Sequence, residues 1–350
     1  MKYSKVFIES FGYELAPNII TTRDIEKKLA PFFETIGFGA GLIEGLTGIK
    51  QRRFWDEDHT LATHAATAAQ KALDEADMTS DQIDTLVFCG VGQDGFEPAT
   101  SCAVAHHLKL LEHAQVYDVK NACLGMLTGM VQVANQIELG QIRAGLVVSC
   151  ETARQIVEST IKEINAAADI EFYKEAVATL TGGAGAAAVL LTDGSIGHPK
   201  TPKHQFIGGI LKNAIEHHGL CSWGFEQKGM PTHSKVVMRT QAQGVLEHGL
   251  TLVKKTFEIF KRDFHLLPDQ PDKFIGHQVG SLHHKKFYDA LNVDMAKDFC
   301  TYPFLGNMGS VALPATAAIA DERGFLKPGD LVAFIGVGSG LNCAVLGVKW

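Results

Sequence analysis

The sequence has no segment suited to export or to membrane insertion. Its first 20 residues lack the basic start, apolar core and small-residue cleavage site of a signal peptide. No apolar run is long enough to span a bilayer. The seven cysteines are odd in number and have no paired spacing, which is typical of proteins kept in a reducing compartment. We therefore expect a cytoplasmic protein.

The sequence also lacks any run of basic residues. Its formal net charge is −7 at pH 7, which argues against a nucleic-acid partner. The rest of the composition is that of a soluble globular protein, with 46% hydrophobic and 20% charged residues, and a length of 350 residues is enough for two domains. Glycine, by contrast, is abundant, with 35 residues. These residues cluster at expected strand ends and turns, where the backbone must bend or approach a neighbour closely.

Apolar, strand-like segments alternate with helical ones along the chain. The expected strands include 5–12, 83–90, 144–150 and 330–333, and the expected helices include 60–76, 101–111, 123–139, 241–261 and 282–291. Strands that are apolar throughout indicate sheets covered on both faces, so we predict an α/β protein.

The chain is expected to divide into two halves of similar kind. We place the N-terminal half at 1–195 and the C-terminal half at 196–350, with a linker within 193–205 that is rich in Asp, Gly, Pro and Lys. Residues 155–180 are expected to be helical, as an insertion or a cap. The histidine- and glycine-rich segment 206–240 gives no clear pattern.

The stretch around Cys123 organises the rest. A strand is predicted to end near Val119, and a helix to run from Cys123 to about Leu139. Cys123 would lie at the positive end of the helix macrodipole, which lowers the pKa of a thiol and favours a nucleophilic thiolate. The alternative is a buried cysteine that packs as a small hydrophobic residue. Three small residues would let this helix lie buried against its neighbours, namely Ala122, Gly125 and Gly129.

A shift of 184 positions superposes this stretch on a second one near the C-terminus without a gap. The glycines that then coincide are Gly125 with Gly309, Gly140 with Gly324 and Gly145 with Gly329. The same shift carries Cys123 onto Asn307. Such self-similarity indicates a duplicated α/β unit. A pseudo-two-fold axis would bring both helix starts, and with them Cys123 and Asn307, to one central place.

Five ordered motifs extend the pattern over nearly the whole chain. They are Thr47-Gly48-Ile49 with the arginines that follow, Ala122-Cys123-Leu124-Gly125, Gly276-His277-Gln278-Val279, Leu305-Gly306-Asn307-Met308-Gly309 and Leu326-Lys327-Pro328-Gly329-Asp330. Together they resemble the thiolase superfamily and, within it, the ketoacyl synthase III branch. The resemblance implies a duplicated thiolase fold with five layers, α-β-α-β-α, an obligate homodimer, and a catalytic triad of Cys123, His277 and Asn307.

Within that branch, two features resemble the OleA type, whose members join two fatty acyl-CoA molecules head to head. In the segment Asp94-Gly95-Phe96-Glu97-Pro98, a carboxylate precedes the proline. The chain also ends with Gly338-Ser339-Gly340-Leu341-Asn342-Cys343 and a final Trp350, where primer-type synthases have Gly-Gly-Gly-Phe. The resemblance implies that Glu97 reaches into the active site of the partner subunit and acts there as a base.

The implied reaction is a non-decarboxylative Claisen condensation of two long-chain acyl-CoA thioesters, which gives a 2-alkyl-3-ketoacyl product. Cys123 would carry the first acyl group, and the backbone N–H groups of Cys123 and Ser339 would form the oxyanion hole. Asn307 and a neutral His277 would donate to the oxygen of the second thioester and stabilise its enolate. Glu97 would remove the α-proton, with a pKa raised by an apolar pocket.

Other activities stay open at this point. A decarboxylating 3-oxoacyl-ACP synthase III would join an acyl-CoA starter to malonyl-ACP and would not need Glu97. A degradative thiolase needs a second cysteine, and the surroundings of Cys343 do not match its Cys-x-Gly. A non-catalytic subunit of this fold usually loses the cysteine or the histidine, and both are present. Taken alone, His277 would be a core or surface histidine and Glu97 a solvated loop carboxylate.

The segment 47–55 is a turn rich in cations and aromatic residues. Arg52 and Arg53 are candidates to pair with CoA phosphates, and Trp55 is a candidate to stack on adenine. The alternative is a solvated surface loop. We expect no cofactor, since acyl-CoA would be the substrate. Candidate partners besides the homodimer mate are an acyl carrier protein and downstream olefin-pathway enzymes, and residues 155–180 and 206–240 are candidates to line acyl channels or the dimer interface.

No metal site is expected from the sequence. His283 and His284 are adjacent, as metal ligands can be, but they lie on an expected helix beside Lys285 and Lys286. This neighbourhood favours a solvated helix face.

Overall fold

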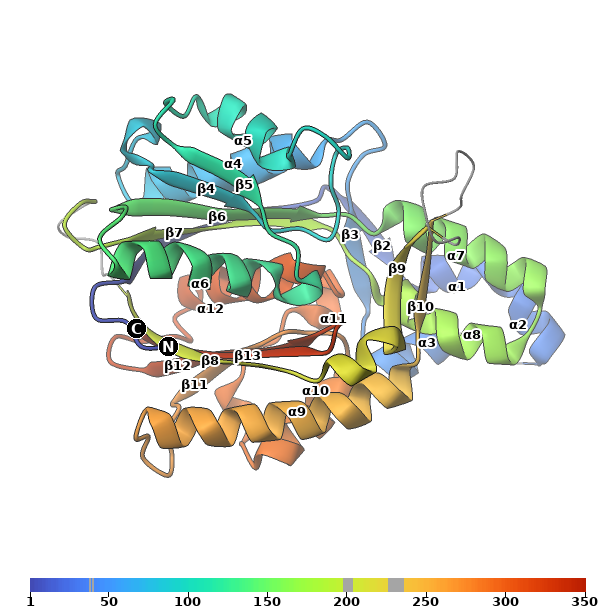
Figure 1. The fold of residues 1–350 in the computed structure, drawn as a ribbon. Helices are drawn as coiled ribbons and strands as arrows, with labels where there is room; N and C mark the ends of the chain where they lie inside the picture. Colours follow the sequence, from blue (N-terminus) through green and yellow to red (C-terminus); the bar gives the residue numbers. More distant parts are fainter. Residues whose placement is uncertain (38, 40, 198–203, 226–235) are drawn as a thin grey trace.

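The computed structural model describes residues 1–37, 39, 41–197, 204–225 and 236–350 (Figure 1). Part of the expected linker and part of the unassigned segment 206–240 thus lie outside the described residues. The main sheet has the strand order β11-β12-β13-β8-β1-β7-β6-β4-β5 and is flanked by helices. The predicted α/β fold class is confirmed.

Two sets of strands make up this sheet. The first set is β1 (Phe7–Leu15), β4 (Thr85–Phe88), β5 (Gln115–Asp118), β6 (Ala144–Glu151) and β7 (Gly185–Thr192). The second set is β8 (His204–Asn213), β11 (Lys273–Gly276), β12 (Leu331–Gly338) and β13 (Asn342–Lys349). β1 and β8 join the two sets through two residue pairs, Phe7 with Gln205 and Ile8 with His204. The two sets then diverge into separate layers (Figure 1).

Helices cover both sets of strands and fill the space between them (Figure 1). The outer helices are α4 (Leu61–Glu75) and α5 (Thr100–Leu108) on the first set, and α9 (Ala242–Asp263) and α10 (Ser281–Leu291) on the second. The central layer contains α6 (Gly125–Glu138) and α12 (Ala312–Glu322). This is the predicted five-layered α-β-α-β-α arrangement, whereas the division into halves at 195/196 stays a prediction.

The two central helices are the repeated unit seen in the sequence. The shift of 184 carries the start of α6, Gly125, onto Gly309, which begins the 3-10 turn η6 (Gly309–Val311) that leads into α12. Beyond the helices the repeat needs a gap. β6 begins at Ala144, which the shift carries to position 328, whereas β12 begins at Leu331. The ungapped pairing of Gly145 with Gly329 is therefore wrong, because the loop after α12 is longer.

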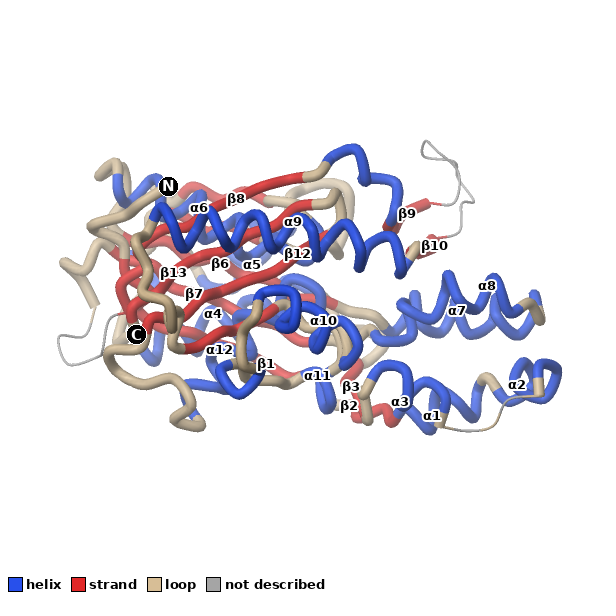
Figure 2. The backbone as a smooth tube through the Cα atoms, turned by 90° about the horizontal axis from the view of Figure 1, so that it is seen from below, coloured by secondary structure: helices blue, strands red, loops and turns tan. Residues whose placement is uncertain are grey.

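A smaller region lies beside the five layers (Figure 2). It contains β2 (Asn18–Thr21), α1 (Thr22–Lys28), α2 (Ala30–Ile36), α3 (Leu42–Thr47), β3 (Gln51–Phe54), α7 (Arg154–Ala167), α8 (Ile170–Ala176), β9 (Cys221–Phe225) and β10 (Val236–Thr240). The predicted helical segment 155–180 is present here, but a strand, β3, occupies four residues of the expected turn at 47–55. Within the described residues, no helix combines the length and apolarity needed to cross a bilayer.

A substitution at Gly12 of β1 tests how closely helix α4 of the outer layer packs on the sheet. A Cβ at Gly12 would lie 2.7 Å from the backbone nitrogen of Ala72 in α4 and closer still to the carbonyl oxygen of Ala68. Because backbone atoms cannot move aside cheaply, we expect Gly12→Ala to lower the free energy of unfolding by ~1–3 kcal/mol in denaturant titrations. The control is Gly45→Ala in exposed α3, where a Cβ meets nothing within 4 Å. It should be neutral or stabilising, so equal losses in both variants would contradict this account.

Candidate active site

The turn that carries Cys123 lies between β5 and α6. The 3-10 turn η2 (Ala122–Leu124) precedes the helix, and Ala122 has a φ of 46°, a left-handed conformation that non-glycine residues seldom adopt. Asn121 fastens this turn, because its amide donates to Thr128 Oγ1 at 2.8 Å and its carbonyl oxygen accepts from Asn342 Nδ2 at 2.9 Å. The turn is thereby tied to the start of β13, directly after the loop between β12 and β13.

That loop brings the predicted oxyanion-hole residues close to each other. A Cβ placed on Gly338, the last residue of β12, would lie 3.6 Å from the backbone nitrogen of Cys123. Ser339 follows Gly338 and lines the same cavity as Cys123. The placement is compatible with two N–H groups that act on one substrate oxygen, which stays a prediction.

Cys123 faces a cavity of about 460 Å³. Asn307 and Ser339 also line this cavity, so three of the predicted site residues come together in it. Other lining residues come from α7, from the hairpin of β9 and β10 and from neighbouring loops, and they include Ala153, Ile156, Ala178, Trp223 and Met238. The described parts of 155–180 and 206–240 therefore supply walls of the cavity.

Asn307 is held by its own backbone and side chain. Its N–H donates to Thr181 O and its carbonyl oxygen accepts from Gly183 N, both at 2.9 Å. Its side-chain oxygen Oδ1 accepts from Gly309 N at 3.0 Å. Since the oxygen is used to orient the side chain, the amide group remains available to donate to a ligand oxygen.

His277 follows β11 directly and donates its backbone N–H to Ile335 O of β12 at 2.9 Å. Its side chain lines a second cavity of about 90 Å³. Burial, with a smaller effect of His283, lowers the pKa of His277 to about 4. Its Nδ1 is buried and has no hydrogen-bond partner among the described residues. The imidazole is therefore neutral at pH 7, as the predicted donor role requires.

The Cys123 thiol behaves differently from the sequence interpretation. Burial raises its pKa to about 12, and the nearby Glu151 and Cys221 add to the effect. The prediction of a lowered thiol pKa is therefore wrong for the resting site. The helix begins two residues later, at Gly125, and burial disfavours the charged thiolate. The thiol of Cys123 and the imidazole of His277 are thus both neutral at rest, and His277 lines the second cavity and not the one that Cys123 faces.

Glu151, at the end of β6, is a site residue that the sequence analysis missed. Its side chain is buried, lines the Cys123 cavity and accepts from Ser310 Oγ at 2.7 Å and from Val91 N at 3.0 Å. Burial raises the pKa of Glu151 although these hydrogen bonds oppose the shift. The sequence held one sign of this role, since Glu151 directly follows an expected strand that contains no other charged residue. A Glu at the end of such a strand is rarely buried unless it has hydrogen-bond partners.

Glu97 does not line the Cys123 cavity of its own chain. It is exposed, in the loop between β4 and α5. The loop begins at the cavity, since Val91 is a lining residue, and then passes β9, where the rings of Phe96 and Phe225 lie 6.1 Å apart. An exposed position near the cavity is compatible with action in a second subunit, which stays a prediction.

The structure contradicts two of the three predicted CoA contacts. Arg52 is fully buried and donates to Thr22 Oγ1 at 2.9 Å and to Leu180 O at 3.0 Å. Trp55 is 1% exposed and its indole N–H donates to Glu151 O at 3.0 Å. Arg52 thus joins segments within the smaller region, whereas Trp55 contacts the end of β6 in the main sheet. Arg53 is half-buried, with one hydrogen bond to Ala16 O, and stays a candidate.

The chain is similar to known proteins along its length. Residues 117–201 match the family model of 3-oxoacyl-[acyl-carrier-protein] synthase III, and residues 263–350 match that of its C-terminal part. The chain is 46% identical to the acyl-CoA:acyl-CoA alkyltransferase of Shewanella oneidensis and 32% identical to that of Xanthomonas campestris, over 100% of both chains in each case.

Solved structures give the same result. Cerulenin-bound OleA of Xanthomonas campestris is similar with a TM-score of 0.92 and 32% identity, over 100% of this chain and 98% of that one. A variant of the same OleA with bound lauric acid and lauroyl-CoA has a TM-score of 0.91 and 31% identity, over 99% of this chain and 100% of that one.

The raised pKa of Cys123 predicts slow alkylation at neutral pH. Because only the thiolate reacts, the rate of iodoacetamide addition to Cys123 should rise about tenfold per pH unit up to about pH 10, without a plateau. The rate is measured by mass spectrometry of the peptide that contains Cys123, which separates it from the exposed Cys102. A plateau near neutral pH would mean that the resting site already holds a thiolate.

Proposed function

Because the chain belongs to the OleA family of acyl-CoA:acyl-CoA alkyltransferases, we propose that it condenses two long-chain fatty acyl-CoA molecules head to head through an acyl group on Cys123. The enzyme is an acyltransferase that forms a carbon–carbon bond. The observation that carries the proposal is the cavity that contains Cys123 and Asn307 and has Ala, Ile, Met and Trp side chains in its wall. Such a wall suits an alkyl chain.

In the first half-reaction, Cys123 attacks the thioester carbonyl of one acyl-CoA. The thiol proton leaves Cys123 as the sulfur–carbon bond forms and passes to the departing CoA sulfur. The oxyanion accepts from the N–H groups of Cys123 and Ser339. CoA departs as a thiol and takes up the proton, so the products are acyl-Cys123 and free CoA.

In the second half-reaction, the α-carbon of another acyl-CoA must lose a proton, because no carboxylate is present to leave as CO₂. We assign this step to Glu97 of the partner subunit within a homodimer. The Nδ2 amide of Asn307 and one nitrogen of the neutral His277 donate to the enolate oxygen. The α-carbon attacks the acyl carbonyl, the bond to the Cys123 sulfur breaks, and the sulfur recovers a proton.

The wall of the cavity supports an alkyl substrate. The small side chains of Ala122, Ala153 and Ala178 leave room beside Cys123, and Ile156 and Met238 add apolar surface. An OleA with 31% identity binds lauric acid and lauroyl-CoA. Small and flexible apolar side chains can pack against acyl chains of different shape. The proposed substrate class is therefore a long-chain acyl-CoA.

The substrate test uses myristoyl-CoA as the only acyl donor and detects products by mass spectrometry. We expect a long-chain 2-alkyl-3-keto acid, or the ketone left after it loses CO₂, without malonyl-CoA. A protein that forms product only when malonyl-ACP is added would be a decarboxylating synthase instead, which would overturn the proposal.

The role of Glu97 in a second subunit predicts complementation between two inactive variants. Cys123→Ala lacks the nucleophile, and Glu97→Gln should lose about 100- to 10,000-fold in condensation rate because it lacks the base. A symmetric dimer has two equivalent sites, so random subunit exchange between the variants should restore about a quarter of the wild-type rate.

Native mass spectrometry would verify that mixed dimers have formed, and Glu97→Gln mixed with itself serves as the control. If mixed dimers form and no activity returns, Glu97 does not act in a second subunit.

A further inference from the structure

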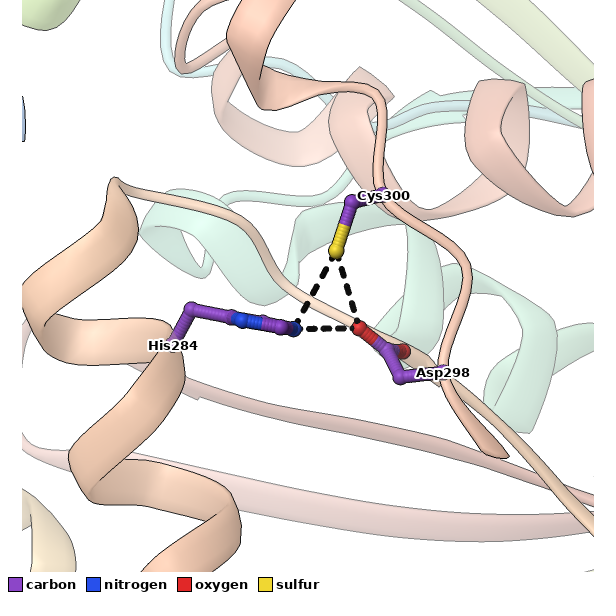
Figure 3. Close-up of side chains that lie close together, drawn as sticks. All are labelled: His284, Asp298 and Cys300. Atoms are coloured by element: carbon purple, nitrogen blue, oxygen red, sulfur yellow. Dashed lines mark hydrogen bonds and ion pairs between the residues drawn. The ribbon is translucent and has the colours of Figure 1, made fainter. Parts of the chain in front are cut away.

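Three potential metal ligands meet near the start of α10, outside the Cys123 cavity (Figure 3). His284 Nε2 lies 2.7 Å from Asp298 Oδ2. Cys300 Sγ lies 3.2 Å from His284 Nε2 and 3.4 Å from Asp298 Oδ2. Figure 3 shows the three side chains pointing toward one another from α10 and from the loop before α11 (Tyr302–Leu305). All three atoms therefore face one point.

The cluster is an inner feature of the fold and not the solvated helix face that the sequence suggests. The side chains of His284 and Asp298 are 9% and 0% exposed, whereas Lys285 and Lys286 are exposed and turn away. Among the described residues, the ion pair of Asp298 is with His284, and no Lys or Arg side chain pairs with it. A buried carboxylate with so little positive charge around it is a favourable place for a cation.

The ligand types and their spacing fit zinc. Sulfur and imidazole nitrogen together favour Zn²⁺ over Mg²⁺ or Ca²⁺, which prefer oxygen ligands. With bonds of about 2.0 Å to N and O and about 2.3 Å to S, tetrahedral ligand atoms lie roughly 3.3–3.5 Å apart. The observed separations of 3.2 and 3.4 Å from the sulfur are close to these values, whereas the 2.7 Å between His284 Nε2 and Asp298 Oδ2 is that of a hydrogen bond and is about 0.6 Å too short. The His284 and Asp298 side chains must therefore move apart when the ion binds.

We propose that His284, Asp298 and Cys300 bind one Zn²⁺ ion, with a water molecule as the fourth ligand. His284 borders the 90 Å³ cavity, which is large enough to hold a water. The buried Tyr288 also lines that cavity, and its hydroxyl interacts with Asp298, one of the proposed ligands. When the metal binds, the Cys300 thiol loses its proton to solvent and coordinates as a thiolate.

The position of the cluster gives the ion a structural role beside the catalytic histidine. Asp298 uses its other oxygen, Oδ1, to accept from Gly276 N at 3.3 Å, directly before His277. Gln278, directly after His277, donates to Phe299 O at 2.7 Å and accepts from Thr301 N at 2.7 Å. An ion that joins α10 to residues 298–300 would hold this backbone, and therefore His277, in place. The inference does not depend on the proposed function.

Titration of the reduced, metal-free protein with Co²⁺ tests the site. Co²⁺ takes the place of Zn²⁺ in such sites, and a bound thiolate gives a charge-transfer band in the near ultraviolet. We expect one equivalent of Co²⁺ to produce this band, Zn²⁺ to displace it, and one zinc per chain by elemental analysis.

Variants identify the ligands. Cys300→Ser should abolish the band and weaken Zn²⁺ binding by more than about 100-fold. Loss of a residue that only hydrogen-bonds to a ligand already weakens metal binding by about 10- to 100-fold, and loss of a ligand itself should weaken it more. Cys123→Ser should retain the band, which excludes the catalytic thiol as its source. On α10, His284→Asn should lose the band, whereas its neighbour His283→Asn should keep it.

Binding should also stabilise the fold. Zn²⁺ should raise the melting temperature of the wild-type protein and of Cys123→Ser, but not that of Cys300→Ser. The proposal would be overturned if the wild-type protein gave no band and held less than stoichiometric zinc. His284, Asp298 and Cys300 would then form a hydrogen-bonded cluster without a metal. A band that persists in Cys300→Ser would overturn the assignment of this ligand.

Discussion

The buried carboxylate of Glu151 joins three chain segments at the cavity that Cys123 faces. It accepts from Val91 and Gly92 after β4, it ends β6, and it accepts from Ser310 at the start of the second central helix. A Cβ on Gly309 would lie 3.1 Å from this carboxylate, and a Cβ on Gly125 would lie 3.5 Å from the Cβ of Ser310, so the glycines let these segments approach one another closely. The cavity exists because these three segments end at one place.

The same burial explains the electrostatic state of the site. Loss of solvent makes the anion of Cys123 and the cation of His277 unfavourable, so both groups are neutral at rest. In the proposed mechanism, a neutral imidazole and the amide of Asn307 stabilise a negative oxygen by donating hydrogen bonds and need no compensating charge. In the same mechanism, the Cys123 thiolate is needed only while an acyl group is transferred.

The sequence predicted the centre of the molecule better than its edges. Cys123 and Asn307 could be found because the duplicated unit repeats its small residues. Small residues are needed there because α6 and α12 pack closely against the sheets. Arg52 and Trp55 were misassigned, since a charged and aromatic segment does not reveal that its side chains turn inward. His284 was misplaced for a similar reason, because its partners Asp298 and Cys300 come from a different segment. Glu97 stands apart, since its proposed role needs a second subunit.

The central claim is that Cys123 carries an acyl group between the two half-reactions. Intact-protein mass spectrometry after brief mixing with myristoyl-CoA tests it most directly, with fragmentation to locate the modified residue. The account predicts one added myristoyl group per chain, on Cys123, in the wild type and its accumulation in Glu97→Gln, where the second step is blocked. An unmodified Cys123 in both proteins, or a myristoyl group on another cysteine, would contradict it.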